Sequence, residues 1–164
     1  MDSALAWIRE RIEAGEKLVI FGWHTEVVER IAEELDCRMI RGGVKVEDRQ
    51  AAVDEFQGDP DTMAIALNIK AGGVGLTLTA SSNVVFVEEP WTPADFDQCV
   101  DRCHRYGQEA LVTAWVLHGE GTIDQWLHDL IAKKRIVVDA ATEGSEEAQR
   151  SVVEELAEML ATLD

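Results

Sequence analysis

The stretch Lys17-Leu-Val-Ile-Phe-Gly-Trp23 introduces the pattern on which the whole chain is built. Its length and β-branched residues are typical of a strand buried on both faces, and an amphipathic segment, Glu26–Leu35, follows it directly. The alternation continues, with further predicted strands at Arg38–Ile40, Thr62–Leu67, Asn83–Val87 and Thr113–Leu117 and further predicted helices at Val46–Phe56, Ala94–Cys103 and Ile123–Val138. Repeated strand–helix–strand units predict an α/β fold, a parallel sheet covered by helices and joined by right-handed crossovers.

Two more helices are expected at the ends of the chain. Residues 2–14 place apolar side chains on one side of an opening helix. Near the other end, residues 139–145 read as a linker and Ser145 as the cap of a last helix, Glu146–Leu163, with an apolar stripe. That stripe either packs on the domain, which we favour, or awaits a partner. We therefore predict a main domain over residues 1–140 and a linker with a terminal helix over 141–164.

Composition and charge limit the possible functions. The 164 residues suit one domain, and the net charge of −17 opposes nucleic acid at long range. A DNA function would need a local basic track; otherwise the acidic residues serve solubility. No apolar run is long enough to cross a membrane, and the acidic, amphipathic start is unlike an export signal. We expect no membrane partner, three reduced cysteines and a cytoplasmic location.

The first candidate site is the loop Asn68-Ile-Lys-Ala-Gly-Gly-Val-Gly-Leu-Thr-Leu-Thr-Ala80. Three glycines in four residues (Gly72, Gly73 and Gly75) let a backbone approach a large anion, and Lys70 adds a positive charge. A tight turn without a ligand is the alternative. The loop fits neither the dinucleotide fingerprint nor a Walker A loop, and no Gly-Lys-Ser/Thr occurs in the chain.

The second candidate site follows Asn83–Val87. Glu88-Glu-Pro-Trp-Thr-Pro93 leads into Gln98-Cys-Val-Asp-Arg-Cys-His-Arg-Tyr-Gly-Gln108, and the predicted helix would place Arg102 and Arg105 on one face. Two such arginines could grip a polyphosphate and neutralise charge that develops at its γ-phosphate. The alternative is a surface helix carrying ion pairs of the Asp101–Arg105 type.

Other conspicuous residues have simpler interpretations. Cys99, Cys103 and His104 lack a second ligand cluster, so we predict no metal site. Trp115 and Trp126 are expected in the core, whereas Trp91, between Pro90 and Pro93 in a loop, could contact a ligand. The basic run Lys133-Lys-Arg135 either balances nearby acid or contacts DNA or another lobe.

The segment AGGVGLTLTASSNVVFVEEPWTPADFDQCVDRCHRYGQ resembles motifs V and VI of SWI/SNF-type DNA translocases, members of helicase superfamily two. Gln98, Arg102, Arg105, Gly107 and Gln108 match the motif VI pattern. Upstream, LVIFGWHTEVVERIAEEL is similar to motif IV, and Gly42, Arg49 and Phe56 keep the family's register. Downstream, Gly121-Thr-Ile-Asp124 and the helix through Lys133-Lys-Arg135 continue the likeness, which covers roughly residues 15–140. Bacterial, phage and annealing-helicase-like members look most similar.

The resemblance implies the second, C-terminal lobe of a two-lobe motor, with a three-layer RecA-like fold. In such motors ATP lies between the lobes, ATP and Mg²⁺ are bound mainly by the N-terminal lobe, and double-stranded DNA crosses both. By position, Arg102 and Arg105 would be arginine fingers, and Gln98, Gly75 and Asp101 would lie near the nucleotide. DNA would be contacted by Lys70, Gly72, Gly73, Thr77 and Trp91. Without a Walker A lobe, which the same gene or another chain would supply, these 164 residues are expected not to hydrolyse ATP.

The sequence also departs from the family at several positions. Arg41 stands where Asp is usual before Gly42, Asn68-Ile-Lys70 replaces Ser-Thr-Arg, and Glu88-Glu89 replaces a single acid. The −17 charge favours a rival hypothesis, a non-catalytic interaction module derived from a helicase lobe. An RNA helicase lobe is disfavoured by the spacing from Gln98 to Gln108. The resemblance to bacterial members places the expected cytoplasm in a bacterium, at the nucleoid or during phage infection.

Overall fold

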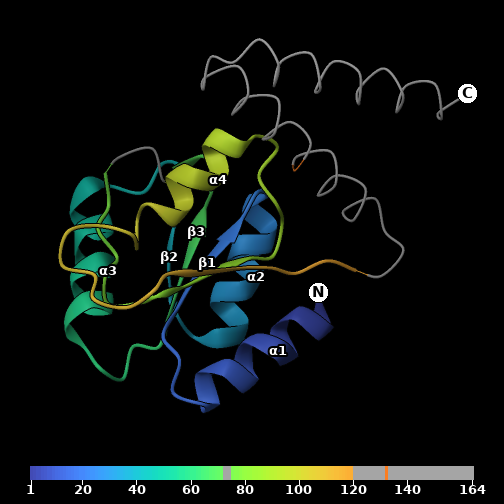
Figure 1. Cartoon of the computed structure of the whole chain (residues 1–164), viewed down its shortest axis with the longest axis horizontal. Coiled ribbons are helices and arrows are strands. Elements are labelled where there is room, and N and C mark those ends of the chain that lie inside the picture. Colours follow the sequence, from blue (N-terminus) through green and yellow to red (C-terminus); the bar gives the residue numbers. More distant parts are fainter. Residues whose placement is uncertain (72–74, 120–131, 133–164) are drawn as a thin grey trace, which may run out of the picture.

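The protein is seen here as a computed structural model, which describes residues 1–71, 75–119 and 132 (Figure 1). Its strands are β1 (Leu18–Gly22), β2 (Arg38–Ile40), β3 (Ala64–Asn68), β4 (Asn83–Phe86) and β5 (Thr113–Val116). Its helices are α1 (Asp2–Glu13), α2 (Thr25–Leu35), α3 (Val46–Gly58) and α4 (Pro93–Val100). The strands form one sheet in the order β2-β3-β1-β4-β5, and every neighbouring pair is parallel.

The centre of the sheet is its most apolar part. All five residues of β1 and of β3 are buried, and β1 pairs with both of its neighbours from Leu18, which lies opposite Ala64 of β3 and Asn83 of β4. A strand with helices over both faces must be apolar at every position rather than at alternate ones. The continuous apolar runs of the sequence are therefore explained by this central position.

Two apolar layers confirm the predicted three-layer arrangement. On one face, Phe21, Phe86 and Leu67 pack with Phe56 of α3 and Cys99 of α4. On the other face, Ile20 and Val85 pack with residues of α1 and α2, among them Leu5, Ile8, Val28 and Ile31. Figure 1 shows the helices arranged around the central strands. Trp115 also packs against this second layer, with its ring centroid 5.4 Å from that of Trp7, as predicted for a core residue.

The predicted elements lie close to the observed ones, with one informative exception. The four strands and three helices that precede α4 differ from their predictions by two residues or fewer at either end, whereas the predicted helix Ala94–Cys103 ends at Val100. Several predictions concern residues outside the described part: the helix 123–138, the boundary at 140, the terminal helix 146–163, Trp126 and the basic run 133–135. No helix among the described residues is both long and apolar enough to span a membrane.

The strand order determines where loops meet. After β1 the chain runs to β2 and returns through β3, and it then crosses to the opposite side of β1 to form β4. In sheets of this kind ligands bind at the carboxyl ends of the strands, beside the point where the direction of winding reverses. Here the loops after β3, β1 and β4 meet at that edge, and they contain both candidate sites.

Candidate functional site

The glycine-rich loop is anchored in the core after its last glycine. Gly72 and Gly73 lie outside the described residues; the chain is described again from Gly75, which is exposed. Leu76 and Leu78 are buried in the layer beneath α3 and α4. The backbone N–H of Leu78 donates to the carbonyl of Arg102 at 2.8 Å. This bond joins the two candidate loops directly.

The expectation that Arg102 and Arg105 share a helical face is wrong. α4 ends at Val100, and both arginines lie in the turns that follow. In a continuing helix the Arg102 carbonyl would accept a bond from the residue four positions on, but it accepts from Leu78 instead. Cys103, which is fully buried, packs into the core between the two arginines. Tertiary contacts thus end the helix one turn early.

Arg105 is fixed against the glycine-rich loop. Its Nη1 donates to the carbonyl of Gly75 at 3.1 Å and to Oγ1 of Thr77 at 3.3 Å. Its Nε donates to the backbone carbonyl of Asp101 at 3.0 Å, so the alternative of an Asp101–Arg105 carboxylate ion pair is not what the structure shows. Within the described part of the chain, Nη2 has no bond, which leaves one edge of the guanidinium available for an anion.

Arg102 is largely buried, with 7% of its surface exposed. Burial, and secondarily the charge of Arg105, lower the pKa of Arg102 from its ordinary value. Its guanidinium makes no hydrogen bond or ion pair to any described residue. None of its nitrogens is among the fully buried atoms that lack a hydrogen-bond partner, so the guanidinium reaches the surface and can bind an anion there.

The structure constrains the side chains of the other residues predicted near the nucleotide less than that of Arg105. Gln98 and Asp101 are both exposed, and the Gln98 side chain makes no hydrogen bond within the described ranges. Gln108 has a clearer role, since its Nε2 donates to the carbonyls of Ser81 at 2.8 Å and Thr79 at 3.2 Å. It ties the arginine turns to the segment between β3 and β4.

The residues predicted to face DNA divide into two groups. Thr77 accepts a hydrogen bond from Arg105, whereas Lys70 lies in a second cluster with Trp23 and Trp91. Lys70 Nζ is 3.2 Å from the carboxylate of Asp95 and 4.7 Å from the Trp23 ring centroid. The Trp23 and Trp91 rings are 6.3 Å apart with their planes tilted by 55°, and Trp91 is 54% exposed.

Sequence reasoning missed the residues that hold this cluster in place. Glu88 accepts the backbone N–H groups of Trp23 and His24 at 2.9 Å each, and Asn68 Nδ2 donates to the Trp23 carbonyl at 2.7 Å. Asn68 is the last residue of β3, and Glu88 lies two residues after the end of β4. This position at the carboxyl end of a buried strand was the signal that could have identified them.

The distribution of ion pairs shows where positive charge is available in this acidic protein. Cations on the outer surface are paired with carboxylates, for example Arg9 with Glu34 and Arg30 with Asp2. Five cations form no ion pair with a described residue. One of them, Lys17, lies at the amino edge, where its Nζ donates to two backbone carbonyls. The other four lie in loops or turns at the carboxyl edge of the sheet or at the start of α3 beside it: Lys45, Arg49, Arg102 and Arg105. The edge can therefore present local positive charge despite the net charge of −17.

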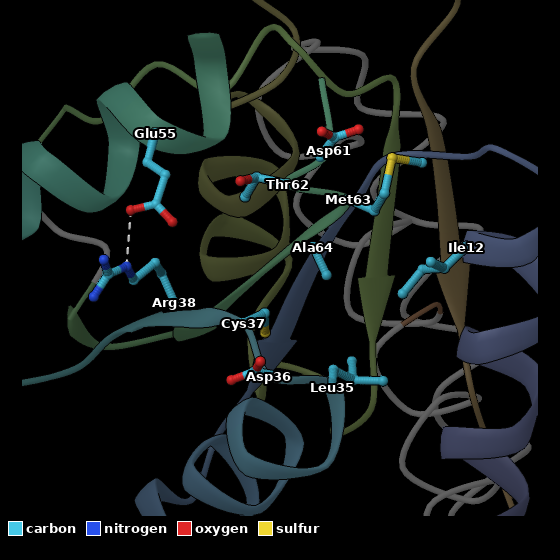
Figure 2. Close-up of a pocket in the computed structure, with 10 residues that line it drawn as sticks. All are labelled: Ile12, Leu35, Asp36, Cys37, Arg38, Glu55, Asp61, Thr62, Met63 and Ala64. Carbon is cyan, nitrogen blue, oxygen red and sulfur yellow. Dashed lines mark hydrogen bonds and ion pairs between the residues drawn. The ribbon is translucent and has the colours of Figure 1, made fainter. Parts of the chain in front are cut away.

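A hollow of about 580 Å³ opens at the opposite, amino edge of the sheet (Figure 2). Its lining comes from the starts of β2 and β3 and the ends of α2 and α3, and it includes Asp36, Cys37 and Asp61. Arg38 is the basic residue in the lining, and its Nε is paired with Glu55 at 2.9 Å. Acidic groups and an already neutralised arginine make this hollow unsuited to a phosphate.

The cysteines are structural in character. Burial raises the pKa of Cys99 and of Cys103 to about 12, so both remain thiols near neutral pH. Among the described residues, no group of three or more His, Cys, Asp or Glu side chains is placed to hold a metal ion.

The fold and site together define a class of protein: a RecA-like lobe, whose carboxyl edge brings a glycine-rich loop against two arginines. Residues 3–107 match the family described as the helicase conserved C-terminal domain. The chain belongs to this family.

Individual relatives agree with this result. Human "DNA annealing helicase and endonuclease ZRANB3" is 37% identical over 136 residues, which are 80% of this chain and 13% of that protein. "Chromatin-remodeling ATPase INO80" of Saccharomyces cerevisiae is 33% identical over 79% of this chain and 9% of its own length. The crystal structure of "the C-terminal part of Fun30 ATPase domain" superposes with a TM-score of 0.69 at 32% identity and covers 79% of this chain and 44% of that one. The chain thus spans a small part of its curated relatives.

These relatives correct the expected location. Proteins of mouse, human and fungi match the chain, and INO80 is named for the remodelling of chromatin, which is nuclear material. The expectation of a bacterial or phage-infected cytoplasm is wrong. The shared C-terminal lobe is what the motifs detected, and these motifs are too general to separate bacterial from eukaryotic members.

Proposed function

We propose that this chain is the second motor lobe of an ATP-dependent double-stranded DNA translocase. An N-terminal RecA-like lobe, in the same polypeptide or in another, would make most of the contacts to ATP and Mg²⁺. This lobe would supply Arg105 and Arg102 to the nucleotide and part of the track for DNA. ATP binding would close the two lobes and hydrolysis would open them.

The observation that carries the proposal is the arrangement of the two arginines. Three bonds to Gly75, Thr77 and Asp101 fix Arg105 and leave Nη2 without a bond to any described residue, while Arg102 is largely buried and also bonds to no described residue through its side chain. A guanidinium held in place before the reaction can stabilise charge on a γ-phosphate without reorganising. Gln98, Gly75 and Asp101 would line the same approach. Lys70, Gly72, Gly73, Thr77 and Trp91 would follow the DNA.

The test requires a first lobe. ATP hydrolysis is measured with this chain joined to, or mixed with, a matching Walker A lobe, with and without duplex DNA. Arg105→Ala and Arg102→Ala should each lower DNA-stimulated turnover by about 10³-fold, the usual effect of losing an arginine finger. Arg30→Ala is the control, since it removes an exposed arginine whose partner is Asp2 on α1. Turnover that is unchanged in Arg105→Ala would refute the proposal, and the chain alone should show no hydrolysis.

The net charge of −17 supports the second candidate, a helicase-derived lobe that binds a protein rather than DNA. Duplex DNA binding at different salt concentrations distinguishes the two candidates. A motor lobe should bind duplex DNA weakly, with an affinity that falls steeply as salt is raised. An interaction module should show no such binding and should tolerate both arginine substitutions.

A further inference from the structure

Glu88 joins the end of β4 to the loop after β1. Its Oε2 accepts the N–H groups of Trp23 and His24 at 2.9 Å each, and its Oε1 lies 2.6 Å from Nδ1 of His24. A Cβ at Gly22 would be in ordinary contact with Glu88 Oε2, at 3.5 Å, and would crowd only a methyl of Val28, at 3.0 Å, so the approach of Glu88 does not depend on this glycine. A single carboxylate therefore fixes two successive peptide N–H groups in the short loop between β1 and α2.

Asn68 holds the other side of Trp23. Its Nδ2 donates to the Trp23 carbonyl at 2.7 Å, and its Oδ1 accepts the N–H of Lys70 at 3.0 Å. The main chain of Trp23 is thus bonded to β4 through its N–H and to β3 through its carbonyl. The second bond of Asn68 also fixes the backbone of Lys70.

The Trp23 ring in turn contacts two exposed groups. Lys70 Nζ lies 4.7 Å from the ring centroid, and the half-exposed Trp91 ring lies 6.3 Å away. Lys70 also contacts Asp95 of α4. A tryptophan whose main chain is fixed at both ends gives these side chains a rigid wall, which lowers the conformational entropy they lose when they bind a ligand.

We propose that Glu88 is a positioning residue that fixes Trp23, with Asn68 as its counterpart, and thereby orients Lys70 and Trp91 toward nucleic acid. The inference rests on the proposed function only for the identity of the ligand. The hydrogen bonds from Glu88 and Asn68 to Trp23 are present in the chain without DNA. Glu88 acts through hydrogen bonds to the loop and does not touch the ligand.

The experiment uses the 164-residue chain with Glu88→Ala, Glu88→Gln and the control Glu13→Ala, which removes an exposed carboxylate of α1. The indole N–H resonances of Trp23 and Trp91 are assigned with Trp→Phe variants, and binding to a fluorescent duplex is measured at low salt. Glu88→Ala should shift both resonances and weaken duplex binding about tenfold, the scale of one lost stacking contact. Glu88→Gln keeps an oxygen that can accept the two N–H groups, so it should restore most of both signals.

Two results would overturn the inference. One is a Glu88→Ala chain that is less stable but has unchanged Trp23 and Trp91 resonances. The other is a chain in which those resonances move while duplex affinity equals that of Glu13→Ala. If the parent chain binds no duplex, the proposed function fails, and the resonances alone then decide whether Glu88 positions Trp91. Should Glu88→Ala not fold, Asn68→Ala removes the bond to the Trp23 carbonyl instead and should shift the same resonances, with Glu88→Gln as the conservative control.

Discussion

The two edges of the sheet are built from the same strands but differ in how their charges are arranged. At the amino edge, Arg38 is neutralised by Glu55, and Lys17 Nζ donates to the carbonyls of Phe56 and Asp59. At the carboxyl edge, Arg102 and Arg105 have no carboxylate partner among the described residues. The hollow of about 580 Å³ opens at the amino edge, where the cations already have partners. The hollow and the two arginines without a described carboxylate partner therefore lie at opposite edges of the sheet.

Among the substitutions that compare the two edges, the largest effect is expected from one that keeps the positive charge. Arg105→Lys cannot make the bonds of Arg105 to Gly75 and Asp101 and still present a second edge to phosphate, because an ammonium has no fork of donors. DNA-stimulated ATP hydrolysis with a first lobe should fall about 100-fold. Arg38→Lys, the matched change at the amino edge, should leave turnover within about twofold. Equal losses of turnover in Arg105→Lys and Arg38→Lys would contradict a special role for Arg105.

Stability should respond in the opposite sense to activity. Arg102→Met replaces a largely buried cation, which forms no ion pair with a described residue, with an apolar side chain of similar length, so the free energy of unfolding should stay the same or rise by about 1–2 kcal/mol. Urea unfolding followed by circular dichroism measures this change. The same substitution at Arg38 removes an exposed ion pair and should lower stability by less than about 1 kcal/mol. A large loss of stability in Arg102→Met would mean that Arg102 has a structural partner.

Releasing one cation from its ion pair at each edge tests which edge binds DNA. Asp95→Asn weakens the hold on Lys70 but keeps an oxygen for the bond from Thr92, so duplex affinity at low salt should rise about threefold. Glu55→Gln releases Arg38 at the amino edge and should leave affinity unchanged. Fluorescence anisotropy with both variants provides the measurement. An equal rise in both would show that only net charge matters.

The smallest expected effect is a change in the pKa of His24, which lies at the carboxyl edge. The hydrogen bond and the charge of Glu88 raise the pKa of His24 above its usual value of about 6.5. Because the folded pKa is raised, the stabilisation is fully present below the usual pKa and is lost as pH rises through the folded pKa. Proton NMR should show a raised His24 pKa that Glu88→Gln lowers more than Glu26→Gln does. A His24 pKa insensitive to Glu88→Gln would contradict the observed contact.

Much of the fold could be predicted because its pattern is local. Buried parallel strands have to be apolar at successive positions, so Leu18–Gly22 and Asn83–Phe86 could be recognised without any knowledge of their neighbours. The end of α4 could not be predicted in this way. Its sequence continues with helical spacing to Cys103, and the bond from Leu78 to the Arg102 carbonyl ends it earlier. The candidate site was predicted in part for the same reason: the arginines were identified, but not the way they are held.

What the sequence determined by itself was the order of strands and helices, the family motifs and the identity of the candidate arginines, since each depends on neighbours along the chain. The tertiary structure alone decided that Arg105 bonds to Gly75 and Thr77, that Arg102 is buried, and that Trp23 is held by Glu88, a residue 65 positions away. Those contacts depend on strand order and register. Both arise from the packing of the whole sheet, so no local spacing of residues encodes them.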